Sequence, residues 1–349
     1  MQETKVQDET ENELMPFRYA ILSYGADYPV DSLVHRLERE VIFVPEFQRK
    51  YVWSLKQASR FIESLLLGLP VPGVFFAKEA DTGKLLIIDG QQRLRTLQYF
   101  YDGLFMGKEF ALKDVQVRYE GLSFKKLGIE DQLRLNDSVI HATIIKQEEP
   151  SDDQSSVYHI FERLNTGGTL LQPQEIRACI FHGPFAELLK EFNDCPDWRT
   201  IYGPPSKRLK DQELILRFLA LFFDKKKYSR PMKEFLNTFM GSNKMLQKVS
   251  RKSLTEAFLP TVRLIAATLS QRAFRPERAL NAAVLDSVMV GIARRLQRSS
   301  IKDEKKIIPV YESLLGAKEY MSAVRAGTSD EPNVTLRIDK AVKAFAELR

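Results

Sequence analysis

A short stretch near position 90 combines the residue types that phosphate chemistry requires. Residues 89–93 (Asp-Gly-Gln-Gln-Arg) follow four apolar residues, Leu85 to Ile88, and precede apolar residues at helical spacing. The pattern predicts a buried strand, a glycine turn and a helix. The first N–H groups of such a helix have no partner inside it and lie at the positive end of the helix dipole, where anions bind.

Each side chain of this stretch suits that chemistry. Gly90 allows a phosphate to approach the backbone closely, and Arg93 supplies a forked donor for phosphate oxygens. Asp89, at the end of the expected strand, is a candidate Mg²⁺ ligand or water-orienting group. The stretch is not a Walker loop, because the sequence contains no such motif. An ordinary strand-to-helix turn with an exposed arginine explains the local pattern equally well.

Two further segments carry candidate nucleotide contacts. Residues 45–53 place three aromatic rings beside an amide and a guanidinium, so that Tyr51 can stack on a base while Gln48 and Arg49 reach phosphates or base edges. The alternative is that the rings are core and only Arg49 is exposed. The other segment is a Gly-Gly loop after an expected helix, and its candidates for facing phosphate are Arg163, Asn165 and Thr166. That loop is equally typical of a plain turn between helices.

The elements that must position these segments follow from apolar periodicity and from end signals. A capping box, Ser54 with Gln57, begins one helix, and a turn at 81–83 joins two strands as a hairpin. Helices are expected over 31–39, 54–67, 91–103, 124–135 and 157–164, and strands over 41–44, 74–77, 85–88, 115–119 and 139–145. From residue 211 onward the periods are helical and strand signals are scarce.

These elements predict an α+β chain with two domains. A small mixed-sheet domain is expected over residues 15–150, and an all-α domain over residues 155–349. Residues 1–14 are acidic and polar, which predicts a disordered tail without the features of a signal peptide. The polar segment around 147–156 is the expected boundary.

Charge divides unevenly between the two parts. Residues 1–150 hold 19 Lys and Arg against 23 Asp and Glu, whereas the remaining residues hold 33 against 23. The second part is therefore basic, which favours a polyanionic partner such as DNA, held through its phosphates. The candidate DNA-binding residues are Lys207, Arg208, Lys225, Lys226, Lys227, Arg294 and Arg295. A solvated helix surface is the alternative explanation.

Several classes of protein are excluded or disfavoured. No apolar run is long enough to span a membrane. Cys179 and Cys195 lack disulfide or metal-ligand spacing, which fits a reducing cytoplasm. The four histidines are scattered, and no H-N-H, zinc-nuclease or nucleophile-elbow motif occurs. The sequence thus predicts no nuclease activity of its own.

Four motifs together carry a resemblance to a known family. They are residues 45–53, 64–70 and 88–97, and residues 160–168 followed by 174–177, in this order along the chain. Over roughly residues 20–220 the chain resembles the N-terminal (S-type) domain of the GmrSD-type, modification-dependent restriction endonucleases. This domain also occurs in phosphorothioate-sensing phage-defence proteins.

The resemblance implies a fold similar to ParB and sulfiredoxin and a site for a nucleoside triphosphate (NTP) with Mg²⁺. Residues 89–93 match the family's NTP-binding and hydrolysis motif, which assigns backbone contacts to Gly90 and Gln91 and catalytic roles to Asp89, Gln92 and Arg93. In those roles Asp89 holds Mg²⁺ or water, Gln92 orients the water, and Arg93 balances developing charge. The Phe-Gln-Arg segment, residues 47–49, lies near this site in relatives.

The resemblance also implies partners. Relatives couple NTP hydrolysis to DNA cleavage by an H-N-H nuclease, either fused behind this domain or present as a separate subunit. The motif is absent here, so a separate nuclease partner is expected, with modified DNA as the sensed ligand. The alternative function is a non-catalytic, ParB-like DNA-binding or regulatory module for which nucleotide is only a conformational ligand. The type of NTP, the DNA modification and homo-oligomer formation are not fixed by the sequence.

Overall fold

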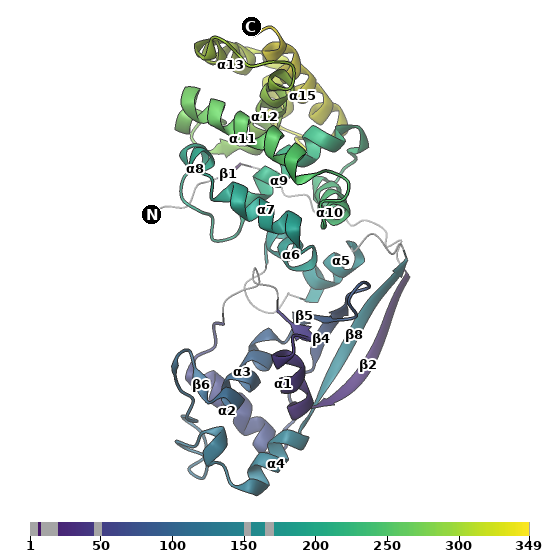
Figure 1. The fold of residues 1–349 in the computed structure, drawn as a ribbon, viewed down its shortest axis with the longest axis vertical. Helices are drawn as coiled ribbons and strands as arrows, with labels where there is room; N and C mark the ends of the chain where they lie inside the picture. The colour runs from purple at the N-terminus through teal and green to yellow at the C-terminus, as the bar shows by residue number, and fades with distance from the viewer. Residues whose placement is uncertain (1–5, 8–19, 45–50, 150–154, 165–170, 349) are drawn as a thin grey trace. The chain divides into compact units, whose positions relative to one another are not determined.

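The computed structural model describes residues 6–7, 20–44, 51–149, 155–164 and 171–348 (Figure 1). Contacts divide the chain into two units. The sheet unit comprises Phe17–Leu171 with Ala178–Ile180. The helical unit comprises Met1–Pro16, Gln172–Arg177 and Phe181–Arg349.

The sheet unit alternates strands and helices. Its strands are β2 (Ala20–Pro29), β3 (Ile42–Phe43), β4 (Val74–Lys78), β5 (Leu85–Asp89), β6 (Leu104–Phe105), β7 (Lys108–Glu109) and β8 (Val139–Glu149). Its helices are α1 (Val30–Glu38), α2 (Leu55–Leu66), α3 (Gln91–Asp102), η1 (Phe124–Lys126), α4 (Ile129–Asp137) and α5 (Ser155–Leu164). Strands β6 and β7 form a separate short hairpin.

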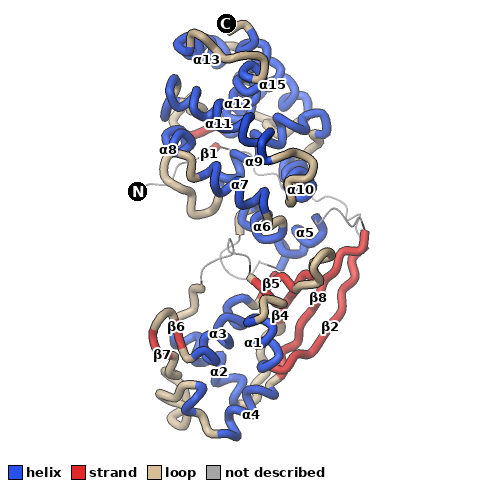
Figure 2. Tube along the Cα trace, viewed as in Figure 1, coloured by secondary structure: helices blue, strands red, loops and turns tan. Residues whose placement is uncertain are grey.

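Among the described residues, five strands form one mixed sheet in the order β2-β8-β4-β5-β3 (Figure 2). The β8–β4 and β5–β3 pairs are parallel, and the β2–β8 and β4–β5 pairs are antiparallel. Phe75 of β4 lies opposite Asp89 at the carboxyl end of β5. The motif at residues 89–93 therefore begins where a nearly central strand leaves the sheet.

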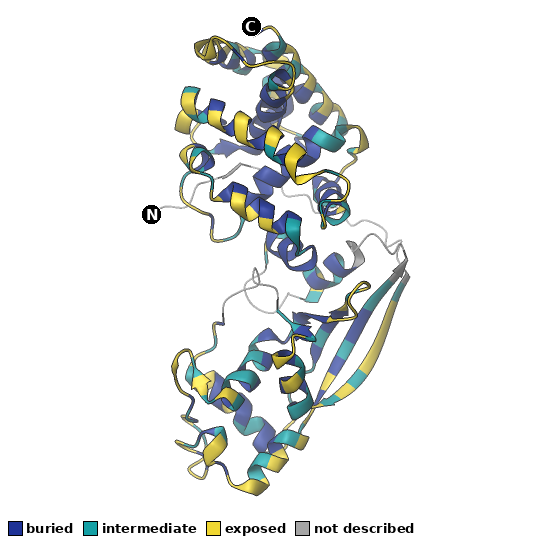
Figure 3. Cartoon of the chain, viewed as in Figure 1, coloured by how far each residue is buried: buried dark blue, intermediate teal, exposed yellow. Residues whose placement is uncertain are grey.

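Both faces of the sheet are covered near β5. Leu85 and Ile87 pack into a core shared with α1, α2 and α3, whereas Leu86 and Ile88 are buried on the opposite face. Helix α5 contacts β5 and β8; in Figure 3 buried and more exposed residues alternate along β8, whereas β5 is mainly buried. A four-residue apolar run without alternation is the pattern that a strand buried on both faces requires.

The helical unit contains α6 (Pro173–Ile180), whose last three residues belong to the sheet unit by contact. The other helices are α7 (Pro184–Asn193), α8 (Pro196–Tyr202), α9 (Lys210–Asp224), η2 (Lys225–Lys227), α10 (Met232–Ser242), α11 (Arg251–Thr268), η3 (Ser270–Arg272), α12 (Ala282–Leu296), η4 (Glu304–Lys306), α13 (Ile307–Gly316), α14 (Lys318–Arg325) and α15 (Glu331–Ala346). The short strands β1 (Val6–Gln7) and β9 (Leu280–Asn281) pair in parallel.

An ionic cluster joins three helices in the core of this unit. Asp286 of α12 accepts from Arg217 of α9 and from Arg337 of α15, with oxygen-to-nitrogen distances of 2.8 to 2.9 Å. The three side chains are at most 2% exposed. Buried charges are tolerated only when they are paired and hydrogen-bonded, and this cluster satisfies that condition.

The predicted α+β class, a mixed sheet followed by a helical region, is confirmed. The expected strand at 115–119 is wrong. The Tyr119 N–H donates to the Gln116 carbonyl in a turn, and Val117 is 93% exposed. Strand β2 was not predicted. Of the expected disordered tail the structure describes only Val6 and Gln7, which form β1. Helix α5 belongs to the sheet unit by contact, so that unit continues past the expected boundary at residue 150.

Candidate functional site

The turn between β5 and α3 has the conformation that residues 89–93 predict. Gly90 has a φ of +98°, in the left-handed region that favours glycine, and a Cβ at this position would lie 2.5 Å from Val74 Cγ1. Glycine is therefore required by backbone geometry and by close packing on β4. Gly90 is also the N-cap of α3 and has no side chain, so it supplies no side-chain cap to the first-turn N–H groups.

Asp89 combines exposure with a fixed orientation. Its Oδ2 accepts from Arg93 Nη2 at 2.6 Å, and its side chain remains 46% exposed. The contact spans four residues, from the last position of the strand to the first turn of the helix. Because the carboxylate is half-exposed and held in place by Arg93, it is oriented and accessible to a ligand.

Arg93 is held more firmly than the sequence suggested. Its Nη1 donates to the carbonyls of Pro72 and Gly73, both at 2.7 Å, and its side chain is 11% exposed. These carbonyls belong to the segment that leads into β4. Arg93 thus fixes the position of Asp89 relative to this segment, and it brings its positive charge to the same end of the sheet.

Gln92 makes a contact that the sequence did not indicate. Its Oε1 accepts from the backbone N–H groups of Val52 at 2.9 Å and Trp53 at 3.2 Å. The two donors lie at the end of the candidate segment at residues 45–53. The amide of Gln92 therefore ties the end of that segment to the first turn of α3.

Tyr51 strengthens the same attachment from inside the core. Its hydroxyl lies 2.7 Å from Thr96 Oγ1, and its ring packs edge-on against Tyr99 and Phe105. Burial raises the pKa of Tyr51 to about 12, although the hydrogen bond to Thr96 opposes the rise. At 7% exposure this ring is core, which is the alternative considered for the aromatic segment; its predicted nucleotide contact stays a prediction.

Of the remaining residues predicted to contact the nucleotide, two are among the described residues and four are not. Gln91 is buried in the first turn of α3, and Arg163 is exposed in the last turn of α5. Gln48, Arg49, Asn165 and Thr166 lie outside the described residues.

This arrangement fits a nucleotide phosphate with Mg²⁺ in two respects. A helix that begins after a glycine N-cap is a common site for an anion, and Asp89 offers a half-exposed carboxylate beside it. Mg²⁺ in phosphate sites is commonly held by one or two carboxylates together with phosphate oxygens and water. Within the described ranges, no group of three or more His, Cys, Asp or Glu side chains forms a metal site.

Most of the predicted DNA-binding side chains have partners within the helical unit. Arg208 pairs with Glu175 at 2.8 Å, Lys227 pairs with Asp224 at 2.9 Å, and Lys225 pairs with Asp339. Lys207 and Lys226 are exposed. Contact of these residues with DNA stays a prediction, and internal ion pairs reduce the charge available for it.

The two arginines of α12 that were predicted to bind DNA make contacts within the fold. Arg294 donates to the Phe222 carbonyl, with its guanidinium 4.2 Å from the centroid of that ring. Arg295 is 6% exposed and donates to the carbonyls of Leu348 and Ser299. Both guanidiniums therefore bind backbone oxygens of the fold.

Residues 174–177, the last motif of the resemblance, also have a structural setting. Arg177 is 1% exposed and donates to Glu213 Oε2 at 2.8 Å and to Asn237 Oδ1 at 2.7 Å. Burial alone would raise the pKa of Glu213, but Lys210 and Arg177 outweigh it and lower the pKa to about 2. The motif fastens α6 to α9 and α10.

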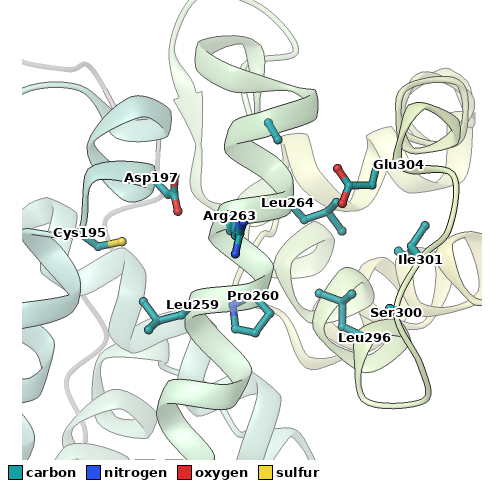
Figure 4. Close-up of a pocket in the computed structure, with 11 residues that line it drawn as sticks. Cys195, Asp197, Leu259, Pro260, Arg263, Leu264, Leu296, Ser300, Ile301 and Glu304 are labelled. Atoms are coloured by element: carbon teal, nitrogen blue, oxygen red, sulfur yellow. The ribbon is translucent and has the colours of Figure 1, made fainter.

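A groove of about 740 Å³ lies elsewhere in the helical unit (Figure 4). Cys195 and Asp197 from the start of α8, Arg263 from α11 and Glu304 from η4 line it together with apolar side chains. Among the described residues that form it, none was predicted from the sequence to bind a ligand. In the part of the chain that the structure describes, no helix is both long and apolar enough to cross a membrane.

Comparison with known families adds to this geometry. Residues 30–182 match the family described as GmrSD restriction endonuclease, N-terminal domain. The match begins at α1 and includes β5, α3 and the motif at residues 89–93. No curated protein is significantly similar to the chain.

Proposed function

We propose that this chain, which carries an N-terminal domain of the GmrSD restriction endonuclease family and is a component of a DNA restriction or phage-defence system, binds and hydrolyses a nucleoside triphosphate with Mg²⁺. Hydrolysis would control a separate nuclease subunit in response to modified DNA. The observation that carries the proposal is the glycine turn into α3 with the half-exposed Asp89 carboxylate, oriented by Arg93, beside it.

The phosphates would lie at the start of α3. In this proposal the backbone N–H groups of Gly90 to Gln92 would contact the phosphates, and the positive end of the helix dipole would add to the attraction for an anion. Mg²⁺, when bound with the nucleotide, supplies charge neutralisation for the phosphate oxygens. Asp89 would hold the ion or the attacking water through its exposed carboxylate edge.

Arg93 and Gln92 act mainly by positioning in this proposal. Arg93 keeps Asp89 oriented, and its charge remains near the phosphates even while it donates to the carbonyls of Pro72 and Gly73. Gln92 holds the chain at Val52 and Trp53, next to the segment that contains Gln48 and Arg49. Those two side chains are then the candidates for direct contact with the nucleotide.

The test is phosphate release from ATP, GTP, CTP and UTP with Mg²⁺, with and without plain and modified DNA. Asp89→Ala is expected to abolish release while folding is retained. Asp81→Ala is the matched control, because Asp81 is an exposed aspartate in the turn before β5. Release that continues unchanged in the Asp89 variant would overturn the assignment.

A second function, a regulatory module that binds nucleotide without hydrolysing it, is favoured by one observation. Both polar side chains that follow Gly90 and Gln91 in the motif, Gln92 and Arg93, are used in contacts within the protein. Binding of NTP without product in the same assay would select this function. Its affinity for DNA would then be the property that nucleotide changes.

A further inference from the structure

In the part of the chain that the structure describes, β2 has a strand on one side only. Strand β2 is an edge strand of the five-stranded sheet, and within the described ranges no strand pairs with its outer side. At ten residues it is long for an edge strand. Such an edge presents unpaired N–H and C=O groups to any further strand.

The β2–β8 pair also runs beyond the rest of the sheet. Pairing of β4 with β8 ends at Ile145, whereas pairing of β2 with β8 continues through Gln147 to Glu149. This extension is a two-stranded ribbon, and two strands alone are marginally stable in water. A third strand would stabilise it.

The sequence of β2 does little to protect this edge. Natural edge strands are commonly shielded by lysines, prolines or inward-pointing charges. Residues 21–26 contain no charged residue or proline, and Leu22 and Tyr24 are 44% and 39% exposed. Asp27 is the one charge in the strand, and its carboxylate lies 2.7 Å from His141 Nδ1 on β8.

We propose that β2 pairs with β2 of a second copy of this chain, antiparallel and about a two-fold axis, so that the two sheets become continuous. The occupant is identified by self-complementarity. Directly opposite residues in an antiparallel pair have side chains on the same face. A two-fold axis therefore matches even-numbered residues with even-numbered residues, whichever pair of residues lies at its centre.

The even-numbered positions that would meet are all apolar or aromatic. Leu22, Tyr24, Ala26 and Tyr28 share one face, and contact between the two copies covers the exposed Leu22 and Tyr24. On the other face Asp27 meets uncharged residues unless the axis passes through Asp27 itself. Pairing of β2 with itself thus avoids placing like charges opposite one another. Pairing with an arbitrary strand of another protein would not guarantee this.

The test is sedimentation equilibrium of the full chain from about 1 to about 200 μM, which spans association through an interface of small area. The wild type is expected to form dimers. The double variant Leu22→Lys, Tyr24→Lys is expected to weaken association more than tenfold, because it places lysines of the two copies near one another. Val117→Lys is the control, since Val117 is 93% exposed in a loop far from β2 in sequence.

Hydrogen exchange provides a second measurement that does not depend on a variant. Backbone amides of residues 21–26 are expected to exchange more slowly at high than at low chain concentration. A wild type that stays monomeric overturns the proposal and leaves the edge to a strand from another protein. A dimer that the two lysines do not weaken, in a variant with wild-type circular dichroism, overturns it as well.

Discussion

Asp89 in the sheet unit and Asp286 in the helical unit both accept hydrogen bonds from arginine, at 2.6 Å from Arg93 and at 2.8 Å from each of Arg217 and Arg337. They differ in exposure. The Asp89 side chain is 46% exposed, whereas that of Asp286 is completely buried. Asp89 sits on a turn at the end of a strand, and Asp286 sits in the middle of a helix that is buried on all sides.

The difference separates two uses of one pair of residue types. A ligand cannot reach a buried carboxylate between two arginines. The ion pairs of Asp286 therefore serve to hold three helices together. A half-exposed pair contributes little to folding, because water screens it. An exposed pair of this kind, beside a glycine turn, is better explained by what the carboxylate binds. The comparison predicts opposite effects of the same substitution at the two positions.

The largest effect is expected for Asp286→Asn. The substitution leaves two buried guanidiniums opposite a neutral amide, and breaking such a pair costs about 3–5 kcal/mol of the free energy of unfolding. Urea unfolding followed by circular dichroism measures the change. A loss below about 1 kcal/mol, the range of exposed pairs, would mean that burial does not distinguish the two aspartates.

The pH dependence of stability tests whether the buried ion pairs of Glu213 also stabilise the fold. Its pKa is lowered to about 2 in the folded protein, so the ionised form is favoured by folding. The stabilisation is present above the unfolded pKa of about 4.3 and is lost as the pH falls from about 5 to about 2, through the folded pKa. At about 1.4 kcal/mol per unit of pKa difference, it amounts to about 3 kcal/mol.

The measurement is the free energy of unfolding of the wild type and Glu213→Gln at several pH values. The variant is expected to be less stable at neutral pH and to lose less stability below pH 5. Glu187→Gln, at an exposed position of α7, is the control. Parallel pH profiles for the wild type and the Glu213 variant would contradict the coupling of Glu213 to Arg177 and Lys210.

Asp89→Asn is expected to produce the reverse pattern. Loss of the carboxylate should lower NTP turnover at least a hundredfold, about 2.7 kcal/mol in the activation free energy. The free energy of unfolding should change by less than about 1 kcal/mol, because the pair is partly exposed. Both quantities are measured on one preparation. A large loss of stability without a specific loss of turnover would place Asp89 in the same class as Asp286.

The sequence was informative where local rules determine structure. The Ser54 and Gln57 capping box, the hairpin into β5 and the glycine turn at 90 are all present, because each depends on residues a few positions apart. Strand β2 depends on β8, more than a hundred residues away, for its pairing. Residues 115–119 alternate like a strand but have no partner strand in the described parts of the chain, so they form a turn instead.

The candidate site divides in the same way. Residues 89–93 were predicted together because they are contiguous, and the geometry around Gly90 agrees. The surroundings of Gln92 and Tyr51 were not predictable, since their partners lie about 40 positions away in sequence. Gln92 is adjacent to the proposed phosphate position, which suggested a role in orienting water. Its contact with Val52 and Trp53 suggests a positioning role instead.

The two roles of Gln92 can be separated by kinetics, with the smallest effect of this series. Gln92→Ala removes the acceptor for two backbone N–H groups, worth about 1 kcal/mol, and is expected to raise the KM for NTP about fivefold with little change in kcat. Gln92→Glu keeps an acceptor oxygen and should retain most of the wild-type KM. Gln98→Ala, farther along α3, is the matched control. If instead both Gln92 variants lose kcat while KM stays constant, the side chain acts on the reacting water and the attachment of residues 51–53 to α3 is incidental to turnover.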